Sequence, residues 1–136
     1  IEYAVSVLGV KHIIICGHSH CGACKSLYKD IGDSPDLVHV KKWLELGKNA
    51  KEYTLLAIQD KTDQEKLYRA TERISVVHQM ENLLTFPDVE RKVKNGTLQI
   101  HGWYYRIEDG TLEYYDGEEC SFKPLVESSD KKWVMK

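Results

Sequence analysis

Residues 11–24 read KHIIICGHSHCGAC. Residues 11–16 form an apolar run rich in β-branched side chains that ends at Gly17, which is typical of a strand covered on both faces in a parallel sheet. Residues 17–22 then predict a tight turn, and residues 23–28 predict the start of a helix. A buried strand that passes through a short loop into a helix indicates an α/β fold.

The loop after this strand concentrates soft metal ligands. His18 and Cys21 are three residues apart across a turn bounded by glycines, so both side chains can face one point. Imidazole nitrogen and thiolate sulfur are a natural pair of zinc ligands, and the N-terminus of the following helix favours the thiolate form of cysteine. We therefore predict that His18 and Cys21 bind Zn²⁺, as one half of a four-ligand site.

The same loop has a second interpretation, because Cys21 and Cys24 form a Cys-x-x-Cys motif at a helix start, as in thiol-disulfide redox proteins. A thioredoxin-like protein also needs a proline just before a later strand, facing the disulfide. Neither Pro35, Pro87 nor Pro124 stands before a clear strand in that position. A redox function is the weaker alternative, and it stays open on the sequence alone.

The remaining cysteines and histidines of the chain have ordinary structural explanations. Cys16, at the end of the apolar run, is expected to be a small buried hydrophobic side chain, and Cys24 is expected to lie in the core or to be a bystander thiol. His20 is expected to face solvent or to support the ligands from behind. Four histidines each stand alone in the sequence and are expected to be structural: His12, His39, His78 and His101.

Two helical regions are predicted before residue 60. Residues 1–8 carry apolar side chains at helical spacing, and Gly9 follows where a left-handed C-terminal cap would lie. Residues 34–59 begin with a serine-proline pair, where Ser34 is the expected N-cap, and Gly47 is the expected break in the helix.

A long helix and a hairpin are predicted in the second half. Thr62 to Glu65 fits a capping box, and the helix that follows should end before Pro87, with a short helical segment over residues 88–94. The apolar face of the long helix is expected to contain Leu67, Ala70, Ile74, Val77 and Leu84.

The end of the chain predicts a β-hairpin and a polar tail. Residues 97–107 and 111–115 are the expected strands, and the aspartate-glycine pair at 109–110 is a strong turn signal. Residues 118–136 are mostly polar, with five apolar side chains that pack on this chain or on a partner: Phe122, Leu125, Val126, Trp133 and Val134.

Composition restricts the class of protein. The 136 residues suit one domain, residues 1–136, and 19 basic against 21 acidic side chains without a long block of either sign argue against a nucleic-acid surface. No apolar run approaches the length of a membrane span, and the first residues lack the features of a signal peptide. Three of the four cysteines crowd together rather than forming a disulfide framework. We expect a cytoplasmic protein that binds neither nucleic acid nor a membrane.

Residues 1–22 resemble the central segment of β-class carbonic anhydrases, in which a helix, a buried strand and a Gly-His-x-x-Cys-Gly turn supply zinc ligands. Further similarity runs through residues 79–89 and 101–112, which resemble the family's long helix and its late strand pair, so the resemblance covers nearly the whole chain. It implies a mainly parallel sheet flanked by helices, with His18 and Cys21 among the zinc ligands. It also implies reversible hydration of carbon dioxide to bicarbonate, and assembly into a homodimer or homotetramer.

One part of the family pattern is absent from this sequence. The family has an earlier Cys-x-Asp-Ser-Arg motif, which supplies a second cysteine ligand and an aspartate-arginine pair, and no such motif occurs here. We therefore assign no catalytic residue, and we expect the chain to lack the first strands of the family's sheet. Two ligands alone should hold zinc weakly, so the chain on its own is expected to be poorly metallated or inactive. A non-catalytic assembly module of the same fold is the third interpretation.

Overall fold

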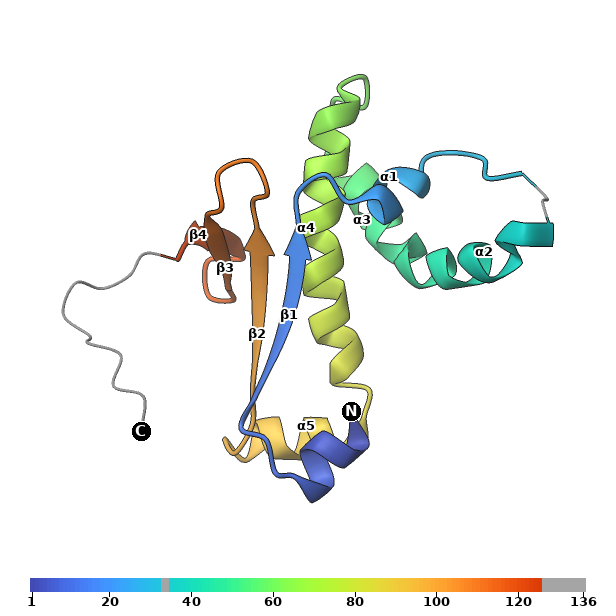
Figure 1. The fold of residues 1–136 in the computed structure, drawn as a ribbon. Helices are drawn as coiled ribbons and strands as arrows, with labels where there is room; N and C mark the ends of the chain where they lie inside the picture. Colours follow the sequence, from blue (N-terminus) through green and yellow to red (C-terminus); the bar gives the residue numbers. More distant parts are fainter. Residues whose placement is uncertain (33–34, 126–136) are drawn as a thin grey trace.

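The structure is a computed structural model that describes residues 1–32 and 35–125. Within these residues it contains one four-stranded sheet with helices along it, beside it and at one end (Figure 1). The strands are β1 (His12–His18), β2 (Gln99–Tyr105), β3 (Leu112–Asp116) and β4 (Ser121–Pro124). The helical segments are η1 (Tyr3–Val7), α1 (Gly22–Ser26), η2 (Pro35–Leu37), α2 (Val38–Leu44), η3 (Glu45–Gly47), α3 (Lys48–Ala57), α4 (Gln64–Leu83) and α5 (Pro87–Lys94).

The sheet is mixed, with strand order β1-β2-β3-β4. β1 and β2 are parallel, and their register places Ile14 beside His101. β2 and β3 form the predicted antiparallel hairpin, in which Gly110 has a φ of +72° and Asp109 accepts hydrogen bonds from the backbone and hydroxyl of Thr111. β4, which pairs antiparallel with β3, was not predicted, because Ser121 to Pro124 is short and largely polar.

Helix α4 packs along β1 and β2, at a place where both strands carry glycine. A Cβ atom at Gly17 would lie 2.5 Å from Cγ2 of Val76, and one at Gly102 would lie 2.5 Å from Sδ of Met80. The face of α4 toward the sheet therefore runs through Val76 and Met80, one helical turn apart. The missing side chains let the helix approach the strands closely.

The predicted apolar face of α4 is only partly right. Leu67 is buried, as expected, but Leu84 is 41% exposed, and Ile74 and Val77 are only half-buried. The buried surface of α4 also contains Tyr68, Thr71, Glu72 and His78. The pattern was misleading because polar side chains with hydrogen-bond partners occupy positions that a purely apolar face would fill.

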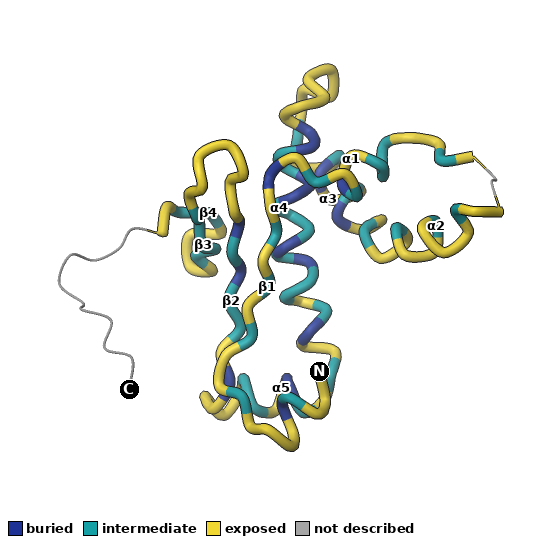
Figure 2. Tube along the Cα trace, viewed as in Figure 1, coloured by how far each residue is buried: buried dark blue, intermediate teal, exposed yellow. Residues whose placement is uncertain are grey.

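The expectation that β1 is covered on both faces is wrong for the described residues. Exposure alternates along the strand, so that Ile13, Ile15 and Gly17 are half-buried while Ile14 and Cys16 are exposed (Figure 2). Because side chains of a strand point alternately to opposite faces, the second set lies on the face away from α4. The prediction that Cys16 is a buried hydrophobic side chain is therefore wrong as well.

The apolar core lies at the end of the sheet where β1 and β2 begin. Its fully buried members come from η1, from the end of α4, from α5 and from the residue before β2: Val5, Leu83, Val89 and Leu98. The first helix, η1, ends at Val7, and Gly9 follows with a φ of +64°, as predicted for a left-handed cap. Pro87 starts α5 at the first helical turn, where its missing N–H costs no hydrogen bond.

The predicted helix over residues 34–59 is broken where expected. Its described part consists of η2 and α2, then η3, which ends at Gly47, and then α3. A Cβ atom at Gly47 would lie 3.1 Å from a methyl group of Leu27, so the glycine lets this segment pack closely beside α1. The predicted N-cap Ser34 and the apolar tail residues beyond Leu125 lie outside the described residues.

The N-cap of α4 lies one residue later than predicted. Asp63, not Thr62, accepts the backbone N–H of Lys66, at 3.0 Å. Thr62 is unavailable because its backbone N–H and its hydroxyl both bond to the carboxylate of Asp60, at 2.9 and 2.6 Å. A local aspartate turn therefore competes with the capping box and replaces it.

Gly102→Ala should lower the stability of the fold by about 1–3 kcal/mol, because the new methyl group would overlap Met80 and press on Val76 and on Cβ of Tyr115. Gly117→Ala is the matched control, since a Cβ atom there meets nothing within 4 Å. Urea unfolding followed by circular dichroism measures both variants. Equal stability of the two variants would show that close packing of α4 on the sheet does not depend on Gly102.

Candidate metal centre

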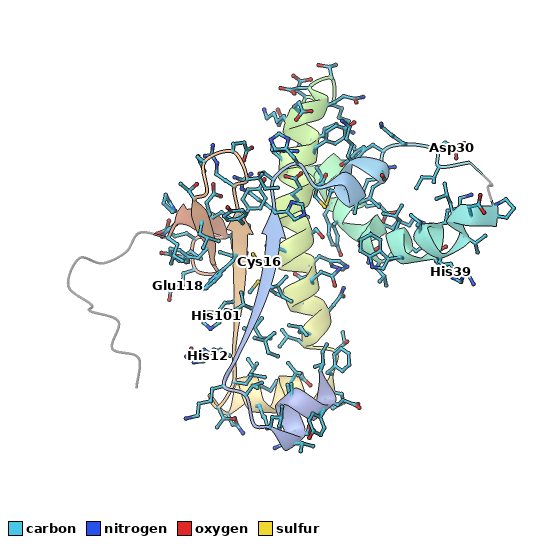
Figure 3. All side chains as sticks on the ribbon, in the orientation of Figure 1. His12, Cys16, Asp30, His39, His101 and Glu118 are labelled. Carbon is cyan, nitrogen blue, oxygen red and sulfur yellow. The ribbon has the colours of Figure 1, made fainter. Side chains whose placement is uncertain are left out.

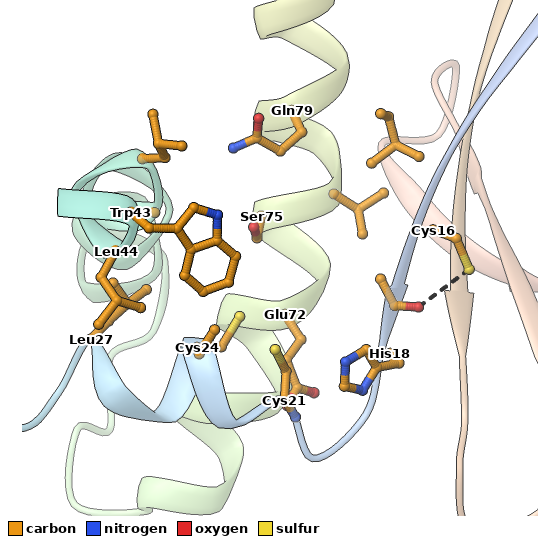
Figure 4. A pocket seen from close by; sticks show the side chains of 16 residues that line it. Cys16, His18, Cys21, Cys24, Leu27, Trp43, Leu44, Glu72, Ser75 and Gln79 are labelled. Carbon is orange, nitrogen blue, oxygen red and sulfur yellow. Dashed lines mark hydrogen bonds between the residues drawn. The ribbon is translucent and has the colours of Figure 1, made fainter. Parts of the chain in front are cut away.

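The two predicted ligands flank the turn between β1 and α1. His18 is the last residue of β1, and Cys21 is the N-cap residue of α1. Both side chains line one pocket of about 320 Å³, which lies between β1, α1 and the segment around Trp43 (Figure 4). The structure therefore brings His18 and Cys21 to the same space, at the carboxyl end of a parallel strand, where α/β proteins commonly bind ligands.

The ring of His18 is oriented by its own loop. Nδ1 lies 2.8 Å from the carbonyl oxygen of Ser19, and because a carbonyl oxygen can only accept, Nδ1 carries the proton. In the neutral ring Nε2 is then unprotonated and keeps a free lone pair. A histidine whose other nitrogen is held in this way is suited to bind a metal through Nε2.

The backbone at Cys21 is held by a buried carboxylate on α4. Oε1 of Glu72 accepts the backbone N–H of Cys21 at 2.8 Å, although the two residues are 51 positions apart in the chain. Glu72 is only 2% exposed. This bond satisfies one of the amides at the start of α1 and ties the loop to α4, so the position of the Cys21 side chain depends on Glu72.

Glu72 has two further partners. Arg69, one turn earlier on α4, donates to Oε1 at 2.9 Å, and the hydroxyl of Tyr104 in β2 donates to Oε2 at 2.7 Å. Burial, followed by the hydrogen bond to Glu72, raises the pKa of Tyr104, which keeps its hydroxyl protonated as a donor. A buried carboxylate with three donors, one of them charged, is the condition under which such a group is tolerated.

A second set of contacts ties the loop to the β2–β3 hairpin. The hydroxyl of Ser19 donates to Oε2 of Glu108 at 2.6 Å and accepts the backbone N–H of Ile107 at 2.8 Å. Nε2 of His20 lies 2.8 Å from Oε1 of Glu108. The hydrogen bond from Ser19 is the largest cause that lowers the pKa of Glu108 from 4.5 to about 2.

These contacts assign His20 a supporting role. Its φ of +56° is rare for a residue with a side chain, and it turns the chain between Ser19 and Cys21. The His20 side chain is 55% exposed and is not part of the pocket lining. This placement matches the expectation that His20 faces solvent or supports the ligands.

The thiol of Cys24 lies in the core beside Cys21, and Cys24 is 8% exposed. Burial, followed by the charge and hydrogen bonding of Cys21, raises the pKa of Cys24 to about 12. A thiol with so high a pKa is neither a ready ligand nor a ready nucleophile near neutral pH. All four cysteines of the chain are free, and Cys16 and Cys120 are exposed.

The donor set fits zinc but is incomplete. An unprotonated imidazole nitrogen and a thiol at a helix N-terminus are two of the four ligands that a zinc site uses. Within residues 1–32 and 35–125, no group of three or more histidine, cysteine, aspartate or glutamate side chains is gathered to hold a metal ion. His18 and Cys21 line one pocket, and their role as zinc ligands therefore stays a prediction.

Sequence reasoning missed the residues that support this half-site: Ser19, Arg69, Glu72, Tyr104 and Glu108. They come from the loop, from α4 and from the hairpin, and only the folded chain brings them together. The sequence contained one indication of the role of Glu72: it is a charged residue on α4 that lies between positions which the helical period places in the core. The other residues have no comparable signal.

Comparison with known proteins gives a consistent result. A family model described as carbonic anhydrase matches residues 1–112. The chain is 38% identical to "Beta carbonic anhydrase 5, chloroplastic" of Arabidopsis thaliana over 115 residues, which cover 83% of this chain and 37% of that protein.

Solved structures agree with this match. The β-carbonic anhydrase CcaA is 34% identical with a TM-score of 0.76, covering 90% of this chain and 55% of that one. One of two tetrameric β-carbonic anhydrases of Sordaria macrospora is 26% identical with a TM-score of 0.70, covering 83% of this chain and 56% of that one. The chain thus spans little more than half the length of these relatives, or less.

Glu72→Gln should destabilise the protein by about 2–4 kcal/mol. The neutral amide cannot balance the charge of Arg69, and its NH₂ group would face a hydrogen-bond donor where the carboxylate has an accepting oxygen. Glu65→Gln is the matched control, since Glu65 also approaches Arg69, at 4.0 Å, but has a 68% exposed side chain. That control should change stability by less than about 0.5 kcal/mol. Equal losses in urea unfolding would contradict a special role for the buried carboxylate.

Glu108 predicts a pH dependence of stability. Its pKa is lower in the folded protein than the ordinary 4.5, so its stabilising effect is fully present above pH 4.5 and is lost as the pH falls toward about 2. Glu108→Gln should therefore lower the melting temperature at neutral pH, and its difference from the parent should shrink across this acidic range. The exposed Glu118→Gln is the control. A difference that stays constant from neutral pH to pH 2 would contradict the assignment.

Proposed function

The chain belongs to the β-carbonic anhydrase family, and we propose that it acts in the zinc-dependent, reversible hydration of carbon dioxide to bicarbonate. The observation that carries this proposal is the half-site: His18 and Cys21 share one pocket at the carboxyl end of β1, and Nε2 of His18 is free to bind. His18 and Cys21 are the proposed zinc ligands. When bound, Zn²⁺ supplies Lewis acidity, which lowers the pKa of water enough to make it a nucleophile near neutral pH.

The residues of this chain orient the ligands rather than react. The carbonyl of Ser19 holds the proton on Nδ1 of His18, which leaves the other ring nitrogen unprotonated. Glu72 holds the Cys21 amide, and Glu108 holds Ser19 and His20. Because both sides of the loop are fixed, the two ligands are positioned before the metal arrives, which reduces the entropy lost on binding.

The proposal requires further ligands, since His18 and Cys21 supply only two positions of a tetrahedral site. Water or residues outside this sequence would fill the others. The proposal also includes a homodimer or homotetramer, supported by the tetrameric relative of Sordaria macrospora. A cytoplasmic location is part of it as well, supported by the four free thiols. No helix in the described part of the chain is long and apolar enough to cross a membrane.

Stopped-flow measurement of carbon dioxide hydration tests the function. The assay compares the 136-residue chain with a chain extended by whatever residues its gene encodes before Ile1, each loaded with Zn²⁺. The extended chain should be active, and the 136 residues alone should be about a hundredfold slower or worse, because an incomplete ligand set binds metal weakly. Equal rates would remove the expectation that ligands are missing. Absence of activity in both zinc-loaded chains would overturn the proposed function.

Alkylation followed by mass spectrometry separates the metal site from a redox site. Added Zn²⁺ should slow alkylation of Cys21 while exposed Cys120 reacts at an unchanged rate, so Cys120 is a control within the same chain. A redox protein would instead form a Cys21–Cys24 disulfide under mild oxidation, whether or not zinc had been added. If Zn²⁺ leaves the alkylation rate of Cys21 unchanged even in the extended chain, Cys21 is not a ligand.

A further inference from the structure

Two histidines that stand alone in the sequence meet on the open face of the sheet. His12 is the first residue of β1, and His101 lies on the adjacent strand β2 (Figure 3). Nδ1 of His12 lies 3.0 Å from Nε2 of His101, and the ring centroids are 5.2 Å apart with an angle of 30° between the planes. This pairing was not predicted, because the two residues lie 89 positions apart in the chain.

The pair is accessible and has no competing partner. Residues of β1 and β2 that face α4, such as Gly17 and Gly102, alternate with His12 and His101, which therefore lie on the opposite face. Within the described part of the chain, neither ring has another hydrogen-bond or ion-pair partner. Burial, followed by the charge of His12, lowers the pKa of His101, which favours the neutral ring that binds metals.

We propose that His12 and His101 together bind a divalent transition-metal ion of the Ni²⁺ and Cu²⁺ class, with water in the remaining positions. Two nitrogens at about 2.1 Å from one ion are about 3.0 Å apart when they subtend 90°, and about 3.4 Å apart at a tetrahedral angle. The observed nitrogens are 3.0 Å apart, and the ring centroids are 5.2 Å apart, so the two nitrogens face each other head-on in the hydrogen bond. Both rings must therefore rotate before their lone pairs converge on one ion, and the preference for Ni²⁺ and Cu²⁺ rests on the affinity of imidazole nitrogen for these ions.

Binding requires the side chains to rotate and one ring to move its proton. In the free pair one ring donates its N–H to the other. The donor ring must change tautomer, so that its proton moves to its other nitrogen, before both facing nitrogens can bind the ion. Neutral histidine makes this change by exchange with water, and no net proton is released. The ion then replaces the hydrogen bond as the link between β1 and β2.

This site is separate from the His18–Cys21 half-site. Six residues of extended strand separate His12 from His18, a distance of roughly 20 Å. The sites also differ in ligand chemistry, since two imidazoles select borderline ions whereas a thiolate adds preference for softer ones. The inference does not depend on carbonic anhydrase activity and remains testable if that proposal fails.

Titration of the chain with Ni²⁺ tests the site, because Ni²⁺ does not oxidise the free thiols as Cu²⁺ does. The readout is the broadening of each histidine ring signal in NMR spectra, so that Ni²⁺ bound by His18 and Cys21 is recorded separately. Substoichiometric Ni²⁺ should broaden the signals of His12 and His101 together and ahead of His39, an exposed histidine on α2. Broadening of only one of the pair, or of neither, would overturn the proposal.

Variants provide a second measurement, made by calorimetry. His12→Asn and His101→Asn should each weaken Ni²⁺ binding at this site about tenfold or more, because a chelate loses one of its two ligands. His39→Asn is the matched control and should leave binding unchanged. Variant affinities that equal that of the parent would contradict a shared ion. If a variant fails to fold, as judged by circular dichroism, the ring signals of the unsubstituted chain still decide.

Discussion

The buried carboxylate of Glu72 is the contact on which the arrangement of the site depends. It lies on α4 yet bonds to the loop after β1, to Tyr104 of β2 and to Arg69 of its own helix. One buried side chain thereby connects the helix, the sheet and the loop that carries the candidate ligands. Its burial is tolerated because its two oxygens accept three hydrogen bonds, one of them from a charged donor.

The glycines at positions 17 and 102 make that contact possible. They allow α4 to lie so close to β1 and β2 that a carboxylate one turn from Val76 reaches both Tyr104 and Cys21. A helix held farther from the sheet would leave Glu72 without these donors. Close packing and polar pairing therefore depend on each other here, and a change to either should affect the loop.

Local signals in the sequence predicted what local chemistry determines. Gly9, Pro87 and the aspartate-glycine turn of the hairpin each require particular backbone angles, and each was found where expected. The placement of His18 and Cys21 at one pocket was also predictable, because the two residues are close in the chain. Contacts between distant segments were not predictable, which is why the pairing of His12 with His101 and the role of Glu72 were missed.

Errors arose where two explanations fit the same residues. The apolar run of β1 suits a strand covered on both faces, but only the fold shows that one face, with Ile14 and Cys16, is open. Similarly, Thr62 suits an N-cap until Asp60 engages it. The type of a residue sets its preference for burial or for a helix cap, whereas its neighbours in space decide whether it adopts that position.

The position of β1 at the edge of the described sheet has a consequence for the chain as a molecule in solution. Its outer backbone groups have no ladder partner among the described strands, and three of its seven residues are isoleucine. Such an edge recruits whatever extended segment is available, including the same strand of another molecule, so it favours aggregation. An extended segment that paired with this edge would lie beside β1, whose last residue is His18.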